Sequence, residues 1–312
     1  MGRRMRRWSI IGMALLLLGL GASWLVGSWL VRGHAGSVAP AVAPTQDIRL
    51  TASDGISIAG TYRPGCSADA PAVLLLHPKG GGRTTMAGNA VWLSARGFAT
   101  LAIDLRGHGQ STITDLSYGL HESRDARVAF NWLKARQRGA PVALIGSSLG
   151  GASALLGDDG PVPADALVLQ AVFPTIHDAI FNRIAFRVGH VPALILEPLL
   201  SGQTWLRIGV PPSRLSPIDA VARYHGPLLL IGGAQDEATP PGEVRAMFAR
   251  ANRPKAIWFA PCFDHAATAG IETPAYRARL LSFLTGAIGA PRCGSPTAVP
   301  PGRMTGTPAS KR

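Results

Sequence analysis

Residues 142–156 read VALIGSSLGGASALL: a short apolar run, the pattern G-x-S-x-G, and a stretch of small residues. A strand, this turn and a helix, in that order, hold a serine on a strained turn with its hydroxyl exposed at the top of a sheet. Gly146 and Gly150 flank the turn because it brings backbone and helix too close together for a side chain. We therefore predict that Ser148 is a nucleophile and that Ser147 has no chemical role. The alternative is a glycine-rich turn without chemistry.

Further apolar runs of buried-strand length lie on both sides of this stretch, and helical periodicity separates most of them. The runs cover residues 72–76, 98–103, 142–145, 166–169, 228–231 and 256–259, and the helical stretches include 86–95 and 123–136. Strands that are apolar on both faces and alternate with helices indicate a parallel sheet covered on each side. Residues 47–53 and 56–62 alternate around Asp54-Gly55, which predicts an antiparallel hairpin. We expect a doubly wound, mostly parallel, eight-stranded α/β sheet.

The regular alternation breaks between Phe173 and Gly226, over a stretch too long for an ordinary connection. It contains two apolar, helix-compatible segments, 176–188 and 193–200, separated by prolines. We expect a small helical cap, at about residues 174–226, over the carboxyl edge of the sheet. The alternative is an extra packing layer with no role in binding.

The N-terminus carries Arg3, Arg4, Arg6 and Arg7 and is followed by an uncharged, mostly apolar run over residues 8–31. At about 1.5 Å per residue this run is roughly 35 Å long, enough to cross a hydrocarbon core. The arginines before it predict a cytoplasmic N-terminus and a catalytic body on the extracytoplasmic, or periplasmic, side of a single-pass cell membrane. A cleaved secretory signal is the alternative, since Ala41-Val42-Ala43 resembles a cleavage site. A retained anchor and a cleaved signal both place the catalytic part of the chain outside the cytoplasm.

The net charge of +13 is spread over both ends and a general excess of arginine over lysine. No helix-turn-helix, zinc-finger spacing or ribonucleoprotein motif is present, so we expect no nucleic-acid partner. A basic surface that faces anionic lipid is the simpler account. The three cysteines, Cys66, Cys262 and Cys293, form no C-x-x-C pair, and two of them could form a disulfide in an oxidising compartment.

A serine nucleophile needs a histidine to take its proton and a carboxylate to orient that histidine. In a doubly wound sheet these groups belong on loops that follow strands. Asp236 comes just after the run 228–231, and His265 comes just after 256–259. The chain order of serine, aspartate and histidine is the order expected for this architecture. We predict that Ser148, Asp236 and His265 are the catalytic residues.

At this point the chain resembles the α/β-hydrolase superfamily of serine esterases and peptidases, from about residue 47 to residue 284. Four landmarks match in order: His77-Pro78-Lys79-Gly80-Gly81-Gly82, Asp104-Leu105-Arg106-Gly107-His108-Gly109-Gln110-Ser111, the turn at Ser148, and the loops of Asp236 and His265. The resemblance implies that the backbone N–H groups of Leu149 and Lys79 form the oxyanion hole. One departure is Pro78, where the family more often has glycine, and a proline removes one N–H there.

The implied reaction is hydrolysis of a carboxylic ester or thioester of a small-molecule or lipid-like acyl substrate, through an acyl-enzyme. We expect no metal and no organic cofactor. Two alternatives stay open: a peptidase or amidase on the same fold, and a binding protein that keeps the fold without turnover. The sequence leaves the substrate and the oligomeric state open.

Other polar residues near these loops are expected to be structural. His77 and His108 are expected to brace loops, and Arg106 to form an ion pair. Asp104 follows the run 98–103, which is the wrong strand for the catalytic carboxylate. Asp264 is expected to face away from its neighbour His265.

The expected organisation along the chain has five parts. They are a cytoplasmic basic segment (1–7), a transmembrane signal anchor (8–31), a linker (32–46), the α/β domain (47–290) and a disordered tail (291–312).

Overall fold

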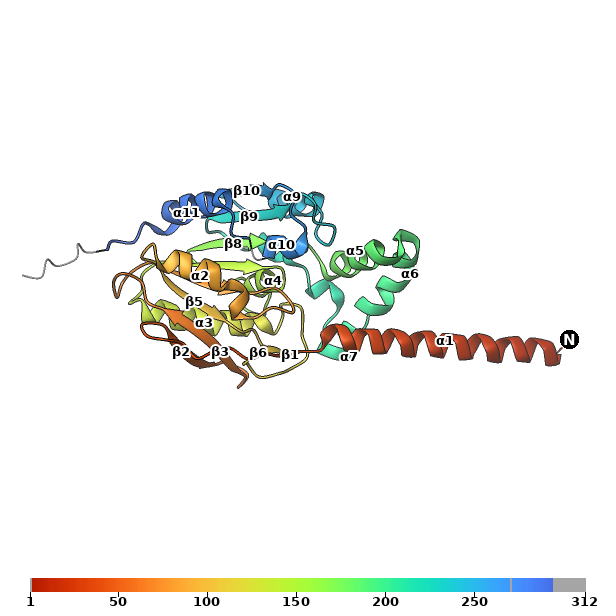
Figure 1. The fold of residues 1–312 in the computed structure, drawn as a ribbon. Helices are drawn as coiled ribbons and strands as arrows, with labels where there is room; N and C mark the ends of the chain where they lie inside the picture. Colours follow the sequence, from red (N-terminus) through yellow and green to blue (C-terminus); the bar gives the residue numbers. More distant parts are fainter. Residues whose placement is uncertain (1, 270, 294–312) are drawn as a thin grey trace, which may run out of the picture.

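A central sheet of eight strands organises the protein (Figure 1), in a computed structural model that describes residues 2–269 and 271–293. The strand order is β10-β9-β8-β7-β4-β5-β3-β2. The strands are β2 (Gln46–Thr51), β3 (Ser57–Arg63), β4 (Ala72–Leu76), β5 (Ala99–Ile103), β7 (Val142–Ser147), β8 (Ala166–Gln170), β9 (Leu228–Gly233) and β10 (Lys255–Ala260). β2 and β3 pair antiparallel, as do β3 and β5, and the other pairs are parallel. The predicted mostly parallel sheet and its hairpin are confirmed.

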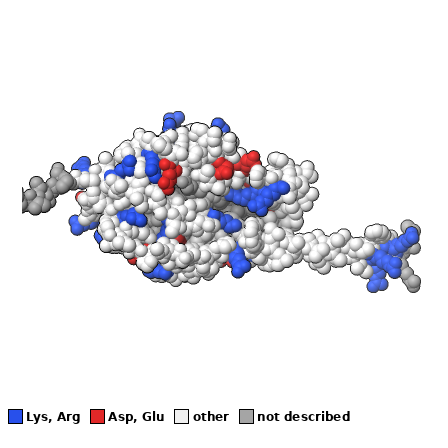
Figure 2. All heavy atoms as spheres, viewed as in Figure 1, with Lys and Arg blue, Asp and Glu red and all other residues white. Residues whose placement is uncertain are grey.

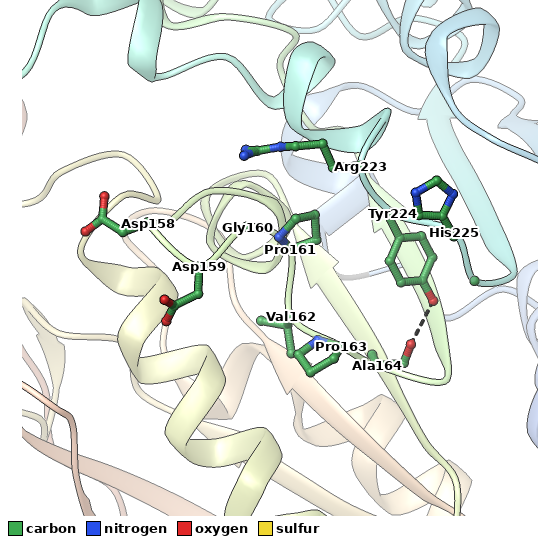
Figure 3. Close-up of a pocket in the computed structure, with 11 residues that line it drawn as sticks. Asp158, Asp159, Gly160, Pro161, Val162, Pro163, Ala164, Arg223, Tyr224 and His225 are labelled. Carbon is green, nitrogen blue, oxygen red and sulfur yellow. Dashed lines mark hydrogen bonds between the residues drawn. The ribbon is translucent and has the colours of Figure 1, made fainter.

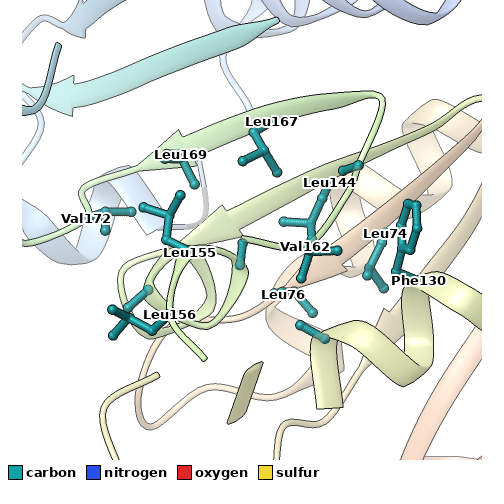
Figure 4. Close-up of a cluster of buried hydrophobic side chains, with 14 of the residues drawn as sticks. Leu74, Leu76, Phe130, Leu144, Leu155, Leu156, Val162, Leu167, Leu169 and Val172 are labelled. Atoms are coloured by element: carbon teal, nitrogen blue, oxygen red, sulfur yellow. The ribbon is translucent and has the colours of Figure 1, made fainter. Parts of the chain in front are cut away.

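Helices cover both faces of this sheet. α3 (Glu122–Arg136), α4 (Leu149–Leu155), α8 (Pro217–Val221) and α9 (Pro241–Arg250) share one hydrophobic cluster, and α2 (Ala87–Ser94) and α11 (Pro274–Ile288) share the other. In β4, Leu74 and Leu76 belong to the first cluster and Val73 and Leu75 to the second, and all four are buried. Figure 4 shows the first cluster, where α4 packs on β7 and β8. Burial on both faces explains why these strands are apolar throughout.

Between β8 and β9 the chain forms a group of short helices that breaks the alternation. It consists of α5 (Ile176–Val188), α6 (His190–Ser201), α7 (Thr204–Ile208), the 3₁₀ helix η2 (Pro212–Arg214) and α8. α5 has the bounds expected from the sequence, and its N-terminus is capped by Thr175, whose hydroxyl accepts a hydrogen bond from the Asp178 N–H. We call α5, α6 and α7 the cap helices.

The N-terminal helix α1 (Gly2–Val31) projects from the end of the molecule where the cap helices lie (Figure 1). After it, β1 (His34–Ala35) pairs with β6 (His108–Gly109) in a separate two-stranded sheet. The segment expected to be a plain linker is therefore held against the α/β domain. Of the expected disordered tail, residues 294–312 lie outside the described residues.

A disulfide joins Cys66, in the loop after β3, to Cys293, beyond the end of α11. It closes a loop over 227 positions of the sequence and ties the two ends of the α/β domain together. Cys262 is free and exposed. The sequence left open which cysteines pair.

A buried cation holds the loop after β5 in place. The guanidinium of Arg106 lies 2.6 Å from Asp54 Oδ2 and 2.7 Å from Asp125 Oδ1, and the Asp125 side chain is fully buried. The hydrogen bond from Arg106 holds the pKa of Asp54 well below its ordinary value. Burial raises the pKa of Asp125 to about 6, although Arg106 opposes that rise. This is the structural ion pair expected for Arg106.

Replacing Arg106 by methionine should lower the free energy of unfolding by about 3–5 kcal/mol, because it removes the cation that pairs with the buried Asp125 and leaves this carboxylate only the backbone N–H of residue 106. The surface pair of Arg127 with Asp159 is the matched control, and Arg127→Met should cost less than about 1 kcal/mol. Urea titration of the two purified variants beside the original chain measures both values. Equal losses in the two variants would contradict a special role for the buried pair.

Candidate active site

Ser148 occupies the sharp turn between β7 and α4. Its backbone has φ 47° and ψ −109°, a conformation that residues other than glycine adopt rarely and only where the surroundings impose it. A Cβ on Gly146 would lie 2.6 Å from the carbonyl oxygen of Gly150, and one on Gly150 would overlap the carbonyl of Leu76. Both flanking positions therefore require glycine, for the reason expected from the sequence.

The structure brings the three predicted side chains together. Ser148 Oγ lies 3.2 Å from His265 Nε2, and His265 Nδ1 lies 2.9 Å from Asp236 Oδ2. Ser148 follows β7, Asp236 follows β9, and His265 is the first residue of α10 (His265–Ala269), which follows β10. Because these strands are parallel, their carboxyl ends meet at one edge of the sheet, and the three side chains meet there.

Asp236 is fixed more firmly than a surface carboxylate. Its side chain is fully buried, and its Oδ1 accepts hydrogen bonds from the N–H groups of Ala238 and Thr239, at 2.9 and 2.7 Å. Its Oδ2 is left for His265. An ionised carboxylate can only accept, so Nδ1 of His265 carries the proton and Nε2 presents its lone pair to Ser148. This arrangement can remove the serine proton and hold the resulting imidazolium.

The loop after β4 carries Lys79, whose N–H group was expected to face the substrate oxygen. His108 Nε2 accepts a hydrogen bond from the Gly80 N–H at 3.1 Å, and the Gly81 N–H donates to the Pro78 carbonyl at 3.0 Å. His77 fixes the start of the loop, since its Nδ1 lies 2.8 Å from the Pro78 carbonyl oxygen. The loop is therefore held by hydrogen bonds although Pro78 stands where related sequences more often have glycine.

The other expected oxyanion donor, the Leu149 N–H, begins α4, where the first N–H groups of a helix have no intrahelical acceptor. Among the hydrogen bonds of the described residues, neither this N–H nor that of Lys79 donates to a protein acceptor. Neither N–H is therefore committed to a protein acceptor, and their role as an oxyanion hole stays a prediction.

His77 and His108 have the structural positions expected of them. Nε2 of His77 accepts a hydrogen bond from the Leu105 N–H at 3.0 Å, and the two rings pack edge to face, with centroids 4.8 Å apart. Burial, together with the nearby His108, lowers the pKa of His77 to about 4, so this imidazole is neutral at physiological pH. Burial also lowers the pKa of His108.

The spare acidic residues lie outside the triad. Asp104 is buried and binds Arg83 Nη1 at 2.6 Å. Asp264 Oδ1 accepts from the Ala267 N–H at 2.8 Å, within the first turn of α10. Glu237 is exposed to solvent. Within residues 2–269 and 271–293, no group of three or more His, Cys, Asp or Glu is placed to hold a metal ion.

One residue beside the triad was missed by sequence reasoning. Arg183, on α5, places Nη2 3.2 Å from His265 Nε2, and its Nη1 donates to the Ala179 carbonyl at 2.7 Å. No motif marks this arginine, because it comes from the stretch where the pattern of strands and helices breaks. The one available signal was the amphipathic pattern of α5: a helical wheel shows which of its residues face the protein, and Arg183 could have been found among them.

A hollow lies on the opposite edge of the sheet, away from these side chains (Figure 3). It is lined by residues 158–164, before β8, and by residues 223–226, before β9. The Tyr224 hydroxyl donates to the Ala164 carbonyl at 2.9 Å there. Because ligands of open α/β sheets bind at the carboxyl ends of strands, this hollow is not the candidate active site.

Comparison with known proteins places this geometry in a family. Residues 68–205 match the family described as serine aminopeptidase, S33. An uncharacterized protein of Mycobacterium tuberculosis (strain H37Rv) is 32% identical over 236 residues, which cover 74% of this chain and 75% of that protein. The α/β hydrolase domain-containing protein WAV2 of Arabidopsis thaliana is 27% identical over 223 residues, 66% of each chain.

Among solved structures, the esterase Pf2001 of Pyrococcus furiosus has a TM-score of 0.63 at 19% identity, and the match covers 82% of this chain and 100% of that one. At this identity the likeness concerns the fold. The strand order, the turn at Ser148 and the sequence relatives agree with one another, and the chain belongs to the α/β-hydrolase superfamily.

Proposed function

We propose that this protein is a serine hydrolase that cleaves a carboxylic ester or thioester. The single observation that supports the proposal is the chain of contacts from Ser148 Oγ through His265 to the buried Asp236. His265 would take the serine proton as Oγ attacks the carbonyl carbon, and the N–H groups of Leu149 and Lys79 would stabilise the oxyanion. The alcohol or thiol would leave with the proton from His265. Water activated by His265 would then release the acid and restore Ser148.

A peptidase of the same fold is the second candidate, and the name of the matching family favours it. Against it, the charged side chain nearest His265 from the cap helices is Arg183. An aminopeptidase must bind a cationic substrate N-terminus, which a neighbouring guanidinium repels. The proposal therefore prefers esters to peptides.

A substrate panel tests this choice with the full chain in detergent. p-Nitrophenyl esters of increasing acyl length should be hydrolysed, and aminoacyl p-nitroanilides should not. Turnover of the anilides alone would assign the protein to the peptidases. Failure to hydrolyse either class, with no labelling by a fluorophosphonate, would favour a binding protein that keeps the fold.

We further propose that α1 is retained as a membrane anchor, with the N-terminus cytoplasmic and the α/β domain on the other side. The helix from Arg4 to Val31 has the length of a membrane span or a signal sequence, and an 18-residue stretch of it has a mean hydropathy of 2.1. Figure 2 shows basic side chains at the free end of α1 and no charged side chains along the rest of its projecting part. The positive-inside tendency gives the orientation, and the Cys66–Cys293 disulfide suits an oxidising compartment.

Contacts between the end of α1 and the cap helices favour retention over cleavage. The Arg207 guanidinium carbon lies 4.0 Å from the centroid of the Trp24 ring, and Arg207 Nη2 donates to the Trp24 carbonyl at 2.8 Å. Gln203 Nε2 donates to the Ser23 carbonyl at 3.0 Å, and the Tyr118 hydroxyl donates to the Leu30 carbonyl at 3.1 Å. Cleavage after Ala43 would remove every one of these partners.

The length of the free part of α1 indicates how deep the cap helices lie. Residues 4–22 of α1 are exposed along their whole length, and contacts with the cap helices begin at Ser23. The apolar part of this free stretch, from Trp8, is about 22 Å long, whereas a hydrocarbon core is about 30 Å thick. The next turns of α1 must therefore lie in the bilayer, together with the cap helices packed beside them.

The cap helices have the surface that such a position requires. Nine large apolar side chains on them are exposed: Phe186, Val188, Val191, Leu194, Ile195, Leu196, Leu199, Trp205 and Leu206. So many exposed large apolar side chains on helices that contact α1 favour contact with lipid.

A spin label tests the immersion of the cap helices in the full chain reconstituted into bilayers. With Cys262→Ser removing the free thiol, a label at Ile195→Cys should collide several-fold more often with dissolved oxygen than with a water-soluble nickel chelate. A label at Ala135→Cys, on the exposed side of α3, should show the reverse. Equal nickel accessibility at the two positions would place the cap helices in water.

A further inference from the structure

Two cationic side chains from separate elements lie at the candidate site. Arg183 comes from α5 and approaches Nε2 of His265, to 3.2 Å. Lys79 comes from the loop after β4, and its ammonium lies 5.8 Å from the centroid of the Tyr118 ring. Arg183 and Tyr118 also lie near each other, since each affects the titration of the other. Arg183 also repels the ammonium of Lys79, so the two cations lie near each other.

Neither cation has a carboxylate partner among the described residues. The two acids whose charge acts on Arg183 are engaged elsewhere. Asp236 binds His265 and two backbone N–H groups. Glu243 accepts a hydrogen bond from Asn182 at 2.6 Å, and burial raises its pKa to about 7, so it carries only part of a negative charge at neutral pH.

The surroundings make these two charges costly without an anion. Partial loss of hydration, together with the nearby Arg183, lowers the pKa of Lys79 to about 8, although the side chain remains exposed to solvent. Burial also lowers the pKa of Arg183, although Tyr118, Asp236 and Glu243 oppose that fall, and Arg187 adds a smaller repulsion. Arg183 and the solvent-exposed Lys79 repel each other, and neither forms an ion pair with a carboxylate, which favours binding of an anionic group beside them.

We propose that Arg183 and Lys79 form a subsite for an anionic group, a carboxylate or a phosphate, carried by the ester substrate close to its scissile bond. The inference rests on the proposed ester hydrolysis and names its substrate class. A guanidinium binds either anion through two parallel hydrogen bonds, and an ammonium adds a point charge.

The position of Arg183 gives the anion a second effect. Nε2 of a neutral imidazole has one lone pair, and both Ser148 Oγ and Arg183 Nη2 lie 3.2 Å from it. While Arg183 donates to Nε2, that lone pair is less available to the serine proton. An anionic substrate draws the guanidinium away and frees Nε2. Esters with the anion should therefore be bound more tightly and also turned over faster than neutral esters of the same size.

Matched esters test the subsite with the full chain in detergent. The probes are mono(4-nitrophenyl) glutarate, the 4-nitrophenyl ester of 4-phosphonobutyric acid, and the neutral 4-nitrophenyl pentanoate. The original chain should prefer an anionic ester. In Arg183→Met, kcat/KM for that ester should fall roughly 10- to 100-fold, the loss typical of a charged hydrogen-bonded contact, while kcat for the pentanoate should rise, because Nε2 of His265 is no longer shared with the guanidinium. The anionic ester whose kcat/KM falls further in Arg183→Met carries the preferred group: a carboxylate if it is the glutarate, a phosphate-like group if it is the phosphonate.

Two further variants separate recognition from folding. Arg183→Lys keeps the charge and should restore part of the anion preference. Arg187→Met, on the exposed end of α5, should leave the kinetics of all three esters unchanged. Equal turnover of neutral and anionic esters by the original chain, or equal losses for both in Arg183→Met, would overturn the subsite while leaving ester hydrolysis intact. Absence of hydrolysis of all three esters would overturn the proposed function and the subsite with it.

Discussion

Ser148→Ala should lower kcat/KM for a p-nitrophenyl ester by about 10⁶-fold, because the variant has no oxygen to form the acyl-enzyme. Residual catalysis would come from the oxyanion donors and substrate binding alone. Alanine keeps the Cβ of serine, so the turn between β7 and α4 and the packing of the sheet should be unchanged. Steady-state kinetics of the purified variant, with circular dichroism to verify folding, measures the loss.

Ser147 supplies the matched control for this prediction. It is the neighbouring serine, its side chain is buried, and its hydroxyl has no hydrogen-bond partner. Ser147→Ala removes the same atom one position away and should keep nearly full activity. A folded Ser148→Ala protein with more than a few per cent of the original activity would contradict the assignment of the nucleophile.

Asp236→Asn should lower kcat by about 10⁴-fold, through the tautomer of His265. The amide oxygen of asparagine can keep the hydrogen bonds from the Ala238 and Thr239 N–H groups. Its NH₂ group would then face Nδ1 of His265, where the carboxylate now accepts. The imidazole would have to accept at Nδ1 and carry its proton on Nε2, where it can no longer take the proton of Ser148. Kinetics at saturating ester separate this loss in kcat from any change in KM.

The neighbouring acid is the control for Asp236. Glu237 is exposed, and Glu237→Gln removes the same charge from the same loop. It should change kcat less than about twofold, since exposed charges have weak effects. Similar losses in the two variants would show that Asp236 acts through the general charge of the loop and not through His265.

The central sheet could be predicted because its strands are buried on both faces. The run from Ala72 to Leu76 is the clearest case: every residue is apolar, and the structure buries all five. The convergence of Ser148, Asp236 and His265 could also be predicted, since residues that follow parallel strands meet at the carboxyl edge. Their catalytic roles stay predictions that the variants above test.

Other features depend on contacts between distant segments, which no local pattern encodes. Arg183 approaches His265 because α5 lies across the carboxyl edge of the sheet. The sequence of α5 indicates only an amphipathic helix and does not indicate where that helix packs. Three cysteines allow three pairings, and only the fold brings Cys66 to Cys293. The packing of Trp24 against Arg207 joins α1 to α7, about 180 residues away, and no local sequence pattern in either helix indicates this contact.

The most direct test of an activated serine in this protein is covalent labelling. The full chain in detergent is incubated with a fluorophosphonate and digested, and the adduct is located by tandem mass spectrometry. We expect one adduct, on Ser148 and not on Ser147, with labelling strongly slowed in His265→Ala. An unlabelled protein, or an adduct on any other residue, would contradict the account.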